Sequence, residues 1–116
     1  MEKIVNIDGR EMRMRASART PRLYRFLIGR DMIADMRKLQ KAYAKTQEGE
    51  NFDALDLTIF ENAAWIMLKQ GGEDVGNSPD EWLDTIDGVF DVYKVMPTLI
   101  SLWQENNATT AIPKKG

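Results

Sequence analysis

The chain has 116 residues, the length of one domain, and contains no cysteine and no histidine, which excludes disulfides, thiolate metal sites and histidine-based catalysis. Its net charge of −2 combines +7 over residues 1–45 with −9 over residues 46–116, so the chain either pairs its two halves internally or offers each to a different partner. Residues 1–5 lack the apolar stretch of a signal peptide and the longest apolar run, residues 63–68, is far shorter than the ~20 residues of a membrane span, so we expect a soluble protein with no membrane partner.

The first predicted element is a β-hairpin over residues 3–16. Asp8-Gly9 separates a β-branched run from an alternating one, and Asp-Gly between two such segments favours a type I′ turn. Because an isolated hairpin is marginal in water, we expect the side with Met12 and Met14 to pack on the helices that follow.

Two helices are expected next. Thr20 as N-cap and Pro21 at the first helical position begin a short helix, which Gly29 ends in a left-handed conformation. Asp31 then caps a second helix that runs to about residue 45. The apolar stripes are Leu23, Phe26 and Leu27 on the first helix, and Met32, Met36, Leu39 and Tyr43 on the second. One uninterrupted helix through Gly29 is the alternative.

The central element is predicted over residues 53–70, which are apolar on nearly all sides and therefore buried. Gly71-Gly72 ends this helix. Residues 78–81 then have the form of a capping box, which begins a short helix that ends near Gly88.

The last helical stretch covers residues 89–106. Pro97 lies inside it and either kinks the helix or starts a new one. Its apolar side comprises Phe90, Tyr93, Met96, Leu99, Ile100 and Trp103. The fold is therefore predicted to be mainly α, with an N-terminal hairpin followed by a compact bundle of about five helices in one domain over residues 1–106, and with a flexible polar tail over residues 107–116.

Carboxylate pairs at helical spacing are the candidates for cation binding or acid–base chemistry. They are Asp53 with Asp56, Asp80 with Asp84, and Asp87 with Asp91. Acidic residues are also common at helix starts and on solvated faces, and no loop has a calcium-binding or phosphate-binding pattern. We therefore expect no catalytic residue, no metal ligand and no cofactor.

The candidate functional residues are instead arginines, carboxylates and aromatic side chains suited to protein contacts. The basic first helix is expected to form one contact surface, and the acidic segment near residue 82 another, between copies of this chain. Two interpretations of Trp82 and Trp103 are open: they are half exposed as interface anchors, or they pack in the core, which is the more common place for such residues. The candidate residues are Arg22, Tyr24, Arg25, Arg30, Asp80, Trp82, Asp84 and Trp103.

Several motifs in order resemble the tail assembly chaperones of long-tailed bacteriophages and prophages from Gram-positive hosts. After the hairpin come a Tyr-Arg motif at residues 24–25, Gly-Arg-Asp at residues 29–31 and Asp-Glu-Trp-Leu at residues 80–83. Residues 102–106 and a polar tail with a basic end complete a similarity that covers nearly the whole chain.

This resemblance implies a non-enzymatic helical protein that coats the tape-measure protein, keeps it soluble and helps to recruit the tail-tube protein. It implies action in the host bacterial cytoplasm and absence from the finished virion, and self-association is a further expectation. In this family a longer form often arises by programmed ribosomal frameshifting, and Lys114-Lys115-Gly116 is what an A-rich slippery stretch would encode.

Two other functions are left open. One is a small nucleic-acid-binding regulator that uses the arginine-rich N-terminal half, although the acidic total charge argues against a nucleic acid partner. The other is a different phage morphogenesis protein, such as a head–tail connector, which would remain in purified virions.

Overall fold

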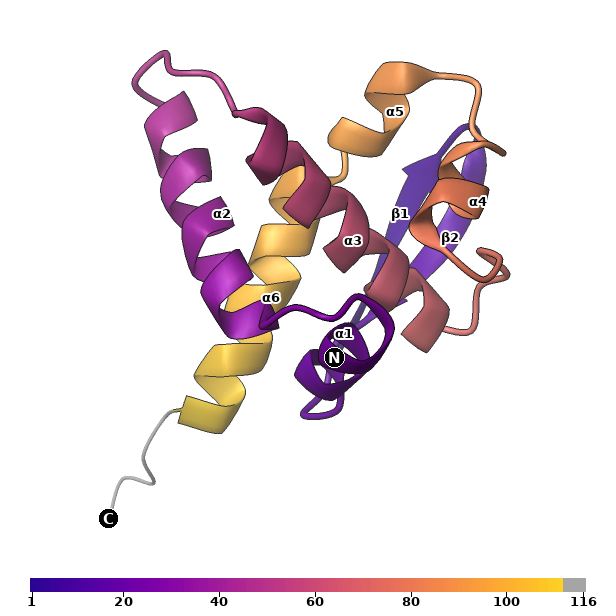
Figure 1. The fold of residues 1–116 in the computed structure, drawn as a ribbon, viewed down its shortest axis with the longest axis horizontal. Coiled ribbons are helices and arrows are strands. Elements are labelled where there is room, and N and C mark those ends of the chain that lie inside the picture. Colours follow the sequence, from indigo (N-terminus) through magenta and orange to yellow (C-terminus); the bar gives the residue numbers. More distant parts are fainter. Residues whose placement is uncertain (112–116) are drawn as a thin grey trace.

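The computed structural model describes the backbone of residues 1–111 and the side chains of residues 1–107. A two-stranded hairpin and five helices are arranged around the long helix α3 (Ala54–Gln70) (Figure 1). The predicted fold class, mainly α with an N-terminal hairpin and a compact helical bundle, is confirmed.

Strands β1 (Glu2–Ile7) and β2 (Arg10–Arg15) form the hairpin, in a register that places Val5 opposite Met12. Asp8 and Gly9 have φ of 56° and 79°, as the predicted type I′ turn requires. The buried face consists of Val5, Ile7, Met12 and Met14. This face covers α3 and α6 (Met96–Ala111), which is how a hairpin too small to be stable alone is held in place.

Helices α1 (Thr20–Leu27) and α2 (Met32–Thr46) are separate, as expected, because Gly29 adopts a left-handed φ of 81° and its N–H bonds back to the carbonyls of Tyr24 and Arg25. Asp31 caps α2 through its bond from the Ile33 amide. The expected N-cap of α1 is wrong by one residue, since Arg19 occupies that position. Thr20 is buried, and its hydroxyl instead donates to the Gln70 side chain, which ties α1 to α3.

Helix α3 is buried on nearly all sides, as its composition predicts. Ile59, Phe60 and every residue of 63–68 are buried. The indole Nε1 of Trp65 donates to the Val75 carbonyl at 3.0 Å, so the loop after α3 closes over this side chain.

The C-terminal part contains the single-turn helices α4 (Pro79–Leu83) and α5 (Val89–Tyr93), followed by α6. Pro97 lies in the first turn of α6, so it starts a new helix rather than kinking one. The capping box of α4 is only half formed. Ser78 Oγ accepts from the Glu81 amide, but the Glu81 carboxylate accepts from the Asn77 amide instead of completing the box.

Helix α6 runs to Ala111 and therefore overlaps the predicted tail over residues 107–111, while residues 112–116, including the Lys-Lys-Gly end, lie outside the described residues. The predicted apolar stripes also need correction at three positions, because Phe26, Leu27 and Phe90 are 82%, 45% and 77% exposed. Between residues 1 and 111, no helix has both the length and the apolar character needed to cross a membrane.

Candidate protein-binding surfaces

A groove of about 410 Å³ lies between α2 and the segment that leads into α3. Arg37, Lys41 and Lys45 form its α2 wall, and Glu50 and Asp53 lie on the opposite wall. The small side chains of Ala34 and Ala42 also line the groove, so a bound segment can approach the α2 backbone closely. The groove therefore has a basic side and an acidic side.

The basic wall follows from the helical repeat. Arg37, Lys41 and Lys45 are spaced four residues apart, which places them on one face of α2. All three are exposed, and none forms an ion pair with another residue of the described chain. Their positive charges are therefore available to an acidic partner.

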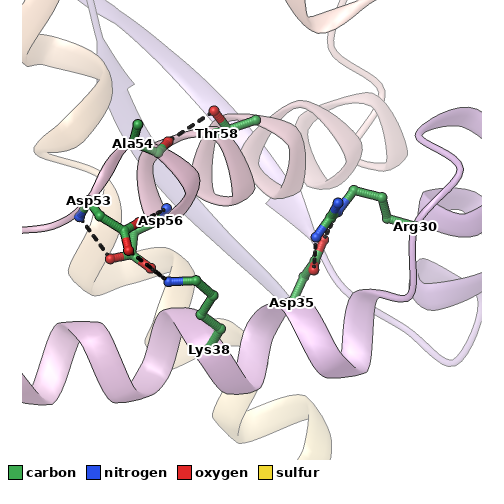
Figure 2. Close-up of polar contacts among 7 residues, drawn as sticks. All are labelled: Arg30, Asp35, Lys38, Asp53, Ala54, Asp56 and Thr58. Atoms are coloured by element: carbon green, nitrogen blue, oxygen red, sulfur yellow. Dashed lines mark hydrogen bonds and ion pairs between the residues drawn. The ribbon is translucent and has the colours of Figure 1, made fainter.

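Lys38 stands beside this wall and links α2 to the start of α3 (Figure 2). Its Nζ lies 2.6 Å from Asp56 Oδ1 and 3.1 Å from Asp53 Oδ2. Hydrogen bonds from Lys38 to these carboxylates raise the pKa of the ammonium group above its ordinary value. Lys38 thus holds together the two elements that form the groove.

The same two carboxylates cap α3. The Asp56 amide donates to Asp53 Oδ1 at 2.7 Å, and the Asp53 amide donates to Asp56 Oδ2 at 2.9 Å. The bond from the Asp56 amide, followed by the bond from Lys38, lowers the pKa of Asp53. The sequence offered Asp53 and Asp56 as a candidate cation-binding pair. In the structure both carboxylates cap the start of α3 instead. Among the described residues, no group of three or more carboxylates has the arrangement of a metal site.

A second polar cluster ties α1 to α2. Arg30 makes a bidentate pair with Asp35, with Nε–Oδ2 at 2.7 Å and Nη2–Oδ1 at 2.8 Å, and the Tyr24 hydroxyl donates to Asp35 Oδ2 at 2.7 Å. The bonds from Arg30 hold the pKa of Asp35 below its ordinary value, while burial raises the pKa of Tyr24. Tyr24 and Arg30 were two of the candidate contact residues. In this fold their side chains instead form hydrogen bonds that hold α1 and α2 together.

The remaining candidates separate into exposed and buried sets. Arg22, Arg25, Asp80 and Asp84 are exposed. Trp82 and Trp103 are 1% and 2% exposed, so of the two interpretations that the sequence left open, core packing is correct and half exposure is wrong. The structure does not bring the basic and acidic candidates together, because α1 and α4 lie well apart (Figure 1).

Sequence reasoning missed the apolar side chains that do reach the surface. Around α1 these are Phe26, Leu27 and Ile33, and at α5 they are Val89 and Phe90. One signal was available, since Tyr24 and Phe26 are about 200° apart around a helix and cannot both face one core. Because Tyr24 is fully buried, Phe26 must point to solvent.

Comparisons with protein-family models, with curated proteins and with solved structures find no match to this chain.

Proposed function

We propose that this protein is a tail assembly chaperone of a long-tailed bacteriophage or prophage, which binds and solubilises the tape-measure protein and helps to recruit tail-tube protein. The order of motifs in the sequence supports the family. The two-sided groove between α2 and α3 is the observation that supports capture of a long polypeptide. The proposed place of action is the host bacterial cytoplasm, and the finished virion is expected to lack the protein.

The groove suits one face of an amphipathic helix. Its volume of about 410 Å³ accepts a row of side chains rather than a whole helix. The aliphatic stems of Arg37, Lys41 and Lys45 supply apolar contact area, while their charged ends meet acidic residues of the client. This is the helix-in-groove mode of recognition, in which apolar contacts give affinity and charges set the register.

The unequal walls also favour one orientation of the client. A helix with acidic residues toward α2 and basic residues toward Glu50 and Asp53 satisfies both sides, whereas the reversed helix places like charges together. A tape-measure protein is a long helical chain that exposes apolar residues before assembly, so many of its segments offer such faces.

Co-expression with the tape-measure protein encoded downstream tests this function. We expect the chain to raise the soluble fraction of that protein several-fold. Replacing Arg37, Lys41 and Lys45 together by Glu should remove most of the increase, because the basic wall then repels the client. The matched control is replacement of Arg10, Arg15 and Arg19 by Glu, which changes the charge equally on exposed sites away from the groove. Equal precipitation of the client with and without this chain would overturn the proposal.

A second candidate function is nucleic acid binding, which one observation favours. Arg15, Arg19 and Lys69 line a hollow of about 230 Å³. Duplex DNA binding whose affinity falls steeply with salt, and which the control triple variant abolishes, would support this function over the first. Absence of binding at low salt would eliminate it.

A further inference from the structure

A basic hollow of about 230 Å³ lies where β2 ends, α1 begins and α3 ends. Arg15 is the last residue of β2, Arg19 is the N-cap of α1, and Lys69 belongs to the last turn of α3. Leu23 and Gln70 complete the lining. We refer to the space that these five residues line as the α1–α3 hollow. Three elements that are separate in the sequence each contribute one cation to it.

The charges of these cations are not neutralised within the described chain. Arg15, Arg19 and Lys69 are exposed and form no ion pair with any described residue. Glu2 lies opposite Arg15 in the hairpin register, but its carboxylate pairs with Arg13 Nε at 3.7 Å. Residues 16–23 contain no acidic side chain. Because three positive charges around one space repel one another, binding of an anion there lowers the electrostatic free energy.

Hydrogen bonds fix the shape of the hollow at its base. The Gln70 side chain donates to Ser17 Oγ and accepts from the Thr20 hydroxyl, both at 2.6 Å. Ser17 Oγ also accepts from the Arg19 amide at 3.1 Å, and the Ser17 amide donates to Thr20 Oγ1 at 2.8 Å. Thr20 is fully buried. The backbone at Arg19 is therefore held against the end of α3 before any ligand binds, which reduces the ordering cost of binding.

The other two cations also extend from positions that the fold fixes. Lys69 Nζ lies 5.4 Å from the centroid of the Trp65 ring, one turn earlier on α3. Arg15 belongs to a strand that packs against α3, where the missing side chain of Gly71 lets the two backbones approach closely. Figure 1 shows the end of α3 between α1 and the hairpin. The hollow is thus a feature of packed elements and not of a loop.

The lining suits a phosphate group better than a carboxylate. A phosphate monoester carries a charge of about −1.5 to −2 at pH 7 and has three acceptor oxygens, whereas a carboxylate carries a single charge on two oxygens. Guanidinium groups bind phosphate oxygens in pairs, and an ammonium group adds a point charge. The hollow is also smaller than the pockets of about 300–1,000 Å³ that take drug-sized ligands, so the ligand is compact.

We infer that the α1–α3 hollow binds a compact dianionic phosphate, either inorganic phosphate or a small phosphomonoester. Arg15, Arg19 and Lys69 donate to its oxygens, and the partly buried Leu23 contacts the organic part of an ester. The inference does not rest on the proposed function, because it does not use the α2–α3 groove. It also differs from the second candidate function, since the phosphates of a duplex follow a line whereas these cations surround one space.

An NMR titration of the ¹⁵N-labelled chain at constant ionic strength tests the site. The probes are inorganic phosphate, glycerol 2-phosphate and dimethyl phosphate, a singly charged diester that represents the phosphates of nucleic acid. We expect the dianions to bind with a dissociation constant of about 1 mM or lower, and the diester to bind about tenfold more weakly or worse. The largest amide shifts should fall in residues 15–23 and 69–71. The dianion that binds more tightly identifies the source of the phosphate.

Single substitutions test the three cations. Arg15→Ala, Arg19→Ala and Lys69→Ala should each weaken binding of the dianions by about fivefold or more. Arg10→Ala is the matched control, because it removes the same charge at the other end of β2 and should bind like the unaltered chain. All four positions are exposed, so the fold should be retained, as far-UV circular dichroism can verify.

Four results would overturn the inference. They are absence of shifts with either dianion at about 20 mM, shifts centred on the α2–α3 groove, variants that bind no more weakly than Arg10→Ala, and equal affinity for the diester and the dianions. The last result would instead support nucleic acid as the ligand, which the duplex binding assay then tests. A chain that binds no phosphate and still solubilises the tape-measure protein would remove this inference and leave the proposed function standing.

Discussion

At the scale of single residues, Asp35 makes the most consequential polar contacts. Asp35 is 6% exposed, and its carboxylate accepts hydrogen bonds from Arg30 on the loop and from Tyr24 on α1. A buried carboxylate is tolerated only when it is paired and hydrogen-bonded, and here the bonds also fix the angle between two helices. Tyr24 therefore links α1 to α2 within the fold. It is not the contact residue that its position between two arginines suggested.

The variant Asp35→Asn should lower the free energy of unfolding by about 1–3 kcal/mol at pH 7, because it removes charge-assisted hydrogen bonds. Arg30 is half exposed and partly screened by solvent, which favours the lower part of this range. The folded-state pKa of Asp35 is lowered, so its contribution is complete above the unfolded value of about 3.9 and is lost as pH falls through the folded pKa.

Urea unfolding at neutral pH and at pH values below that unfolded pKa measures this effect. The difference in the free energy of unfolding between the unaltered chain and Asp35→Asn should shrink toward zero in acid. The control is the exposed Asp87→Asn, which should change the free energy of unfolding little at either pH. A difference that stays constant across this range would contradict the assigned role of Asp35.

Gly71 is required by a close approach and not by its backbone conformation. A Cβ at this position would lie 2.1 Å from the carbonyl oxygen of Arg13, where the end of α3 meets β2. The variant Gly71→Ala should therefore destabilise the fold by about 1–3 kcal/mol, since the backbone of β2 must move.

Gly88→Ala is the matched control for Gly71→Ala. There the atoms nearest to the added Cβ belong to the side chain of Asp91, whose carboxylate can rotate away. Thermal unfolding of the two variants should show the larger loss for Gly71→Ala. Similar melting temperatures would indicate that the backbone of β2 can move away from the end of α3 at little energetic cost.

At the scale of elements, the short helices depend on caps and anchors together. Helix α4 has only five residues, too few to be stable alone, and is held by the Ser78 cap and by buried Trp82. This explains why a chain segment rich in carboxylates still folds onto the core. It also explains why Trp82, the predicted interface anchor, is not available at the surface.

The variant Ser78→Ala should cost about 1 kcal/mol of stability, because the Glu81 amide loses its acceptor. Ser78→Thr keeps a hydroxyl cap and should retain most of that stability. Chemical denaturation of both variants provides the measurement, and a Thr variant as unstable as the Ala variant would exclude the capping role.

At the scale of the whole molecule, the opposed charges of the two halves are neutralised only in part. Lys38 pairs with Asp53 and Asp56, and Lys3 pairs with Glu105 at 3.1 Å. No ion pair with any described residue is formed by Arg22, by Arg25 or by the basic wall of the groove. Partial pairing leaves a molecule with distinct basic and acidic surfaces, which is the physical basis of the proposed function.

The sequence alone predicted the elements whose signals are local. The turn at Asp8-Gly9, the break at Gly29 and the cap at Asp31 each depend on backbone conformations and hydrogen bonds within a few residues, whereas the sequence left open whether Pro97 kinks a helix or starts one. The buried nature of α3 was equally predictable, since a helix that is apolar on all sides has no face suited to water.

Only the tertiary structure decided which apolar and aromatic side chains face solvent. Phe26 and Phe90 were predicted to be buried and are exposed, while Trp82 and Trp103, for which the sequence left both half exposure and core packing open, are buried. Phe26, Trp82 and Phe90 lie on helices of one or two turns, which have too few positions to define an inner face by periodicity, so their burial depends on neighbours that are distant in the sequence. The groove between α2 and α3 has the same origin, because residues 34–45 and 50–56 line one site only after Lys38 and Asp56 join their elements.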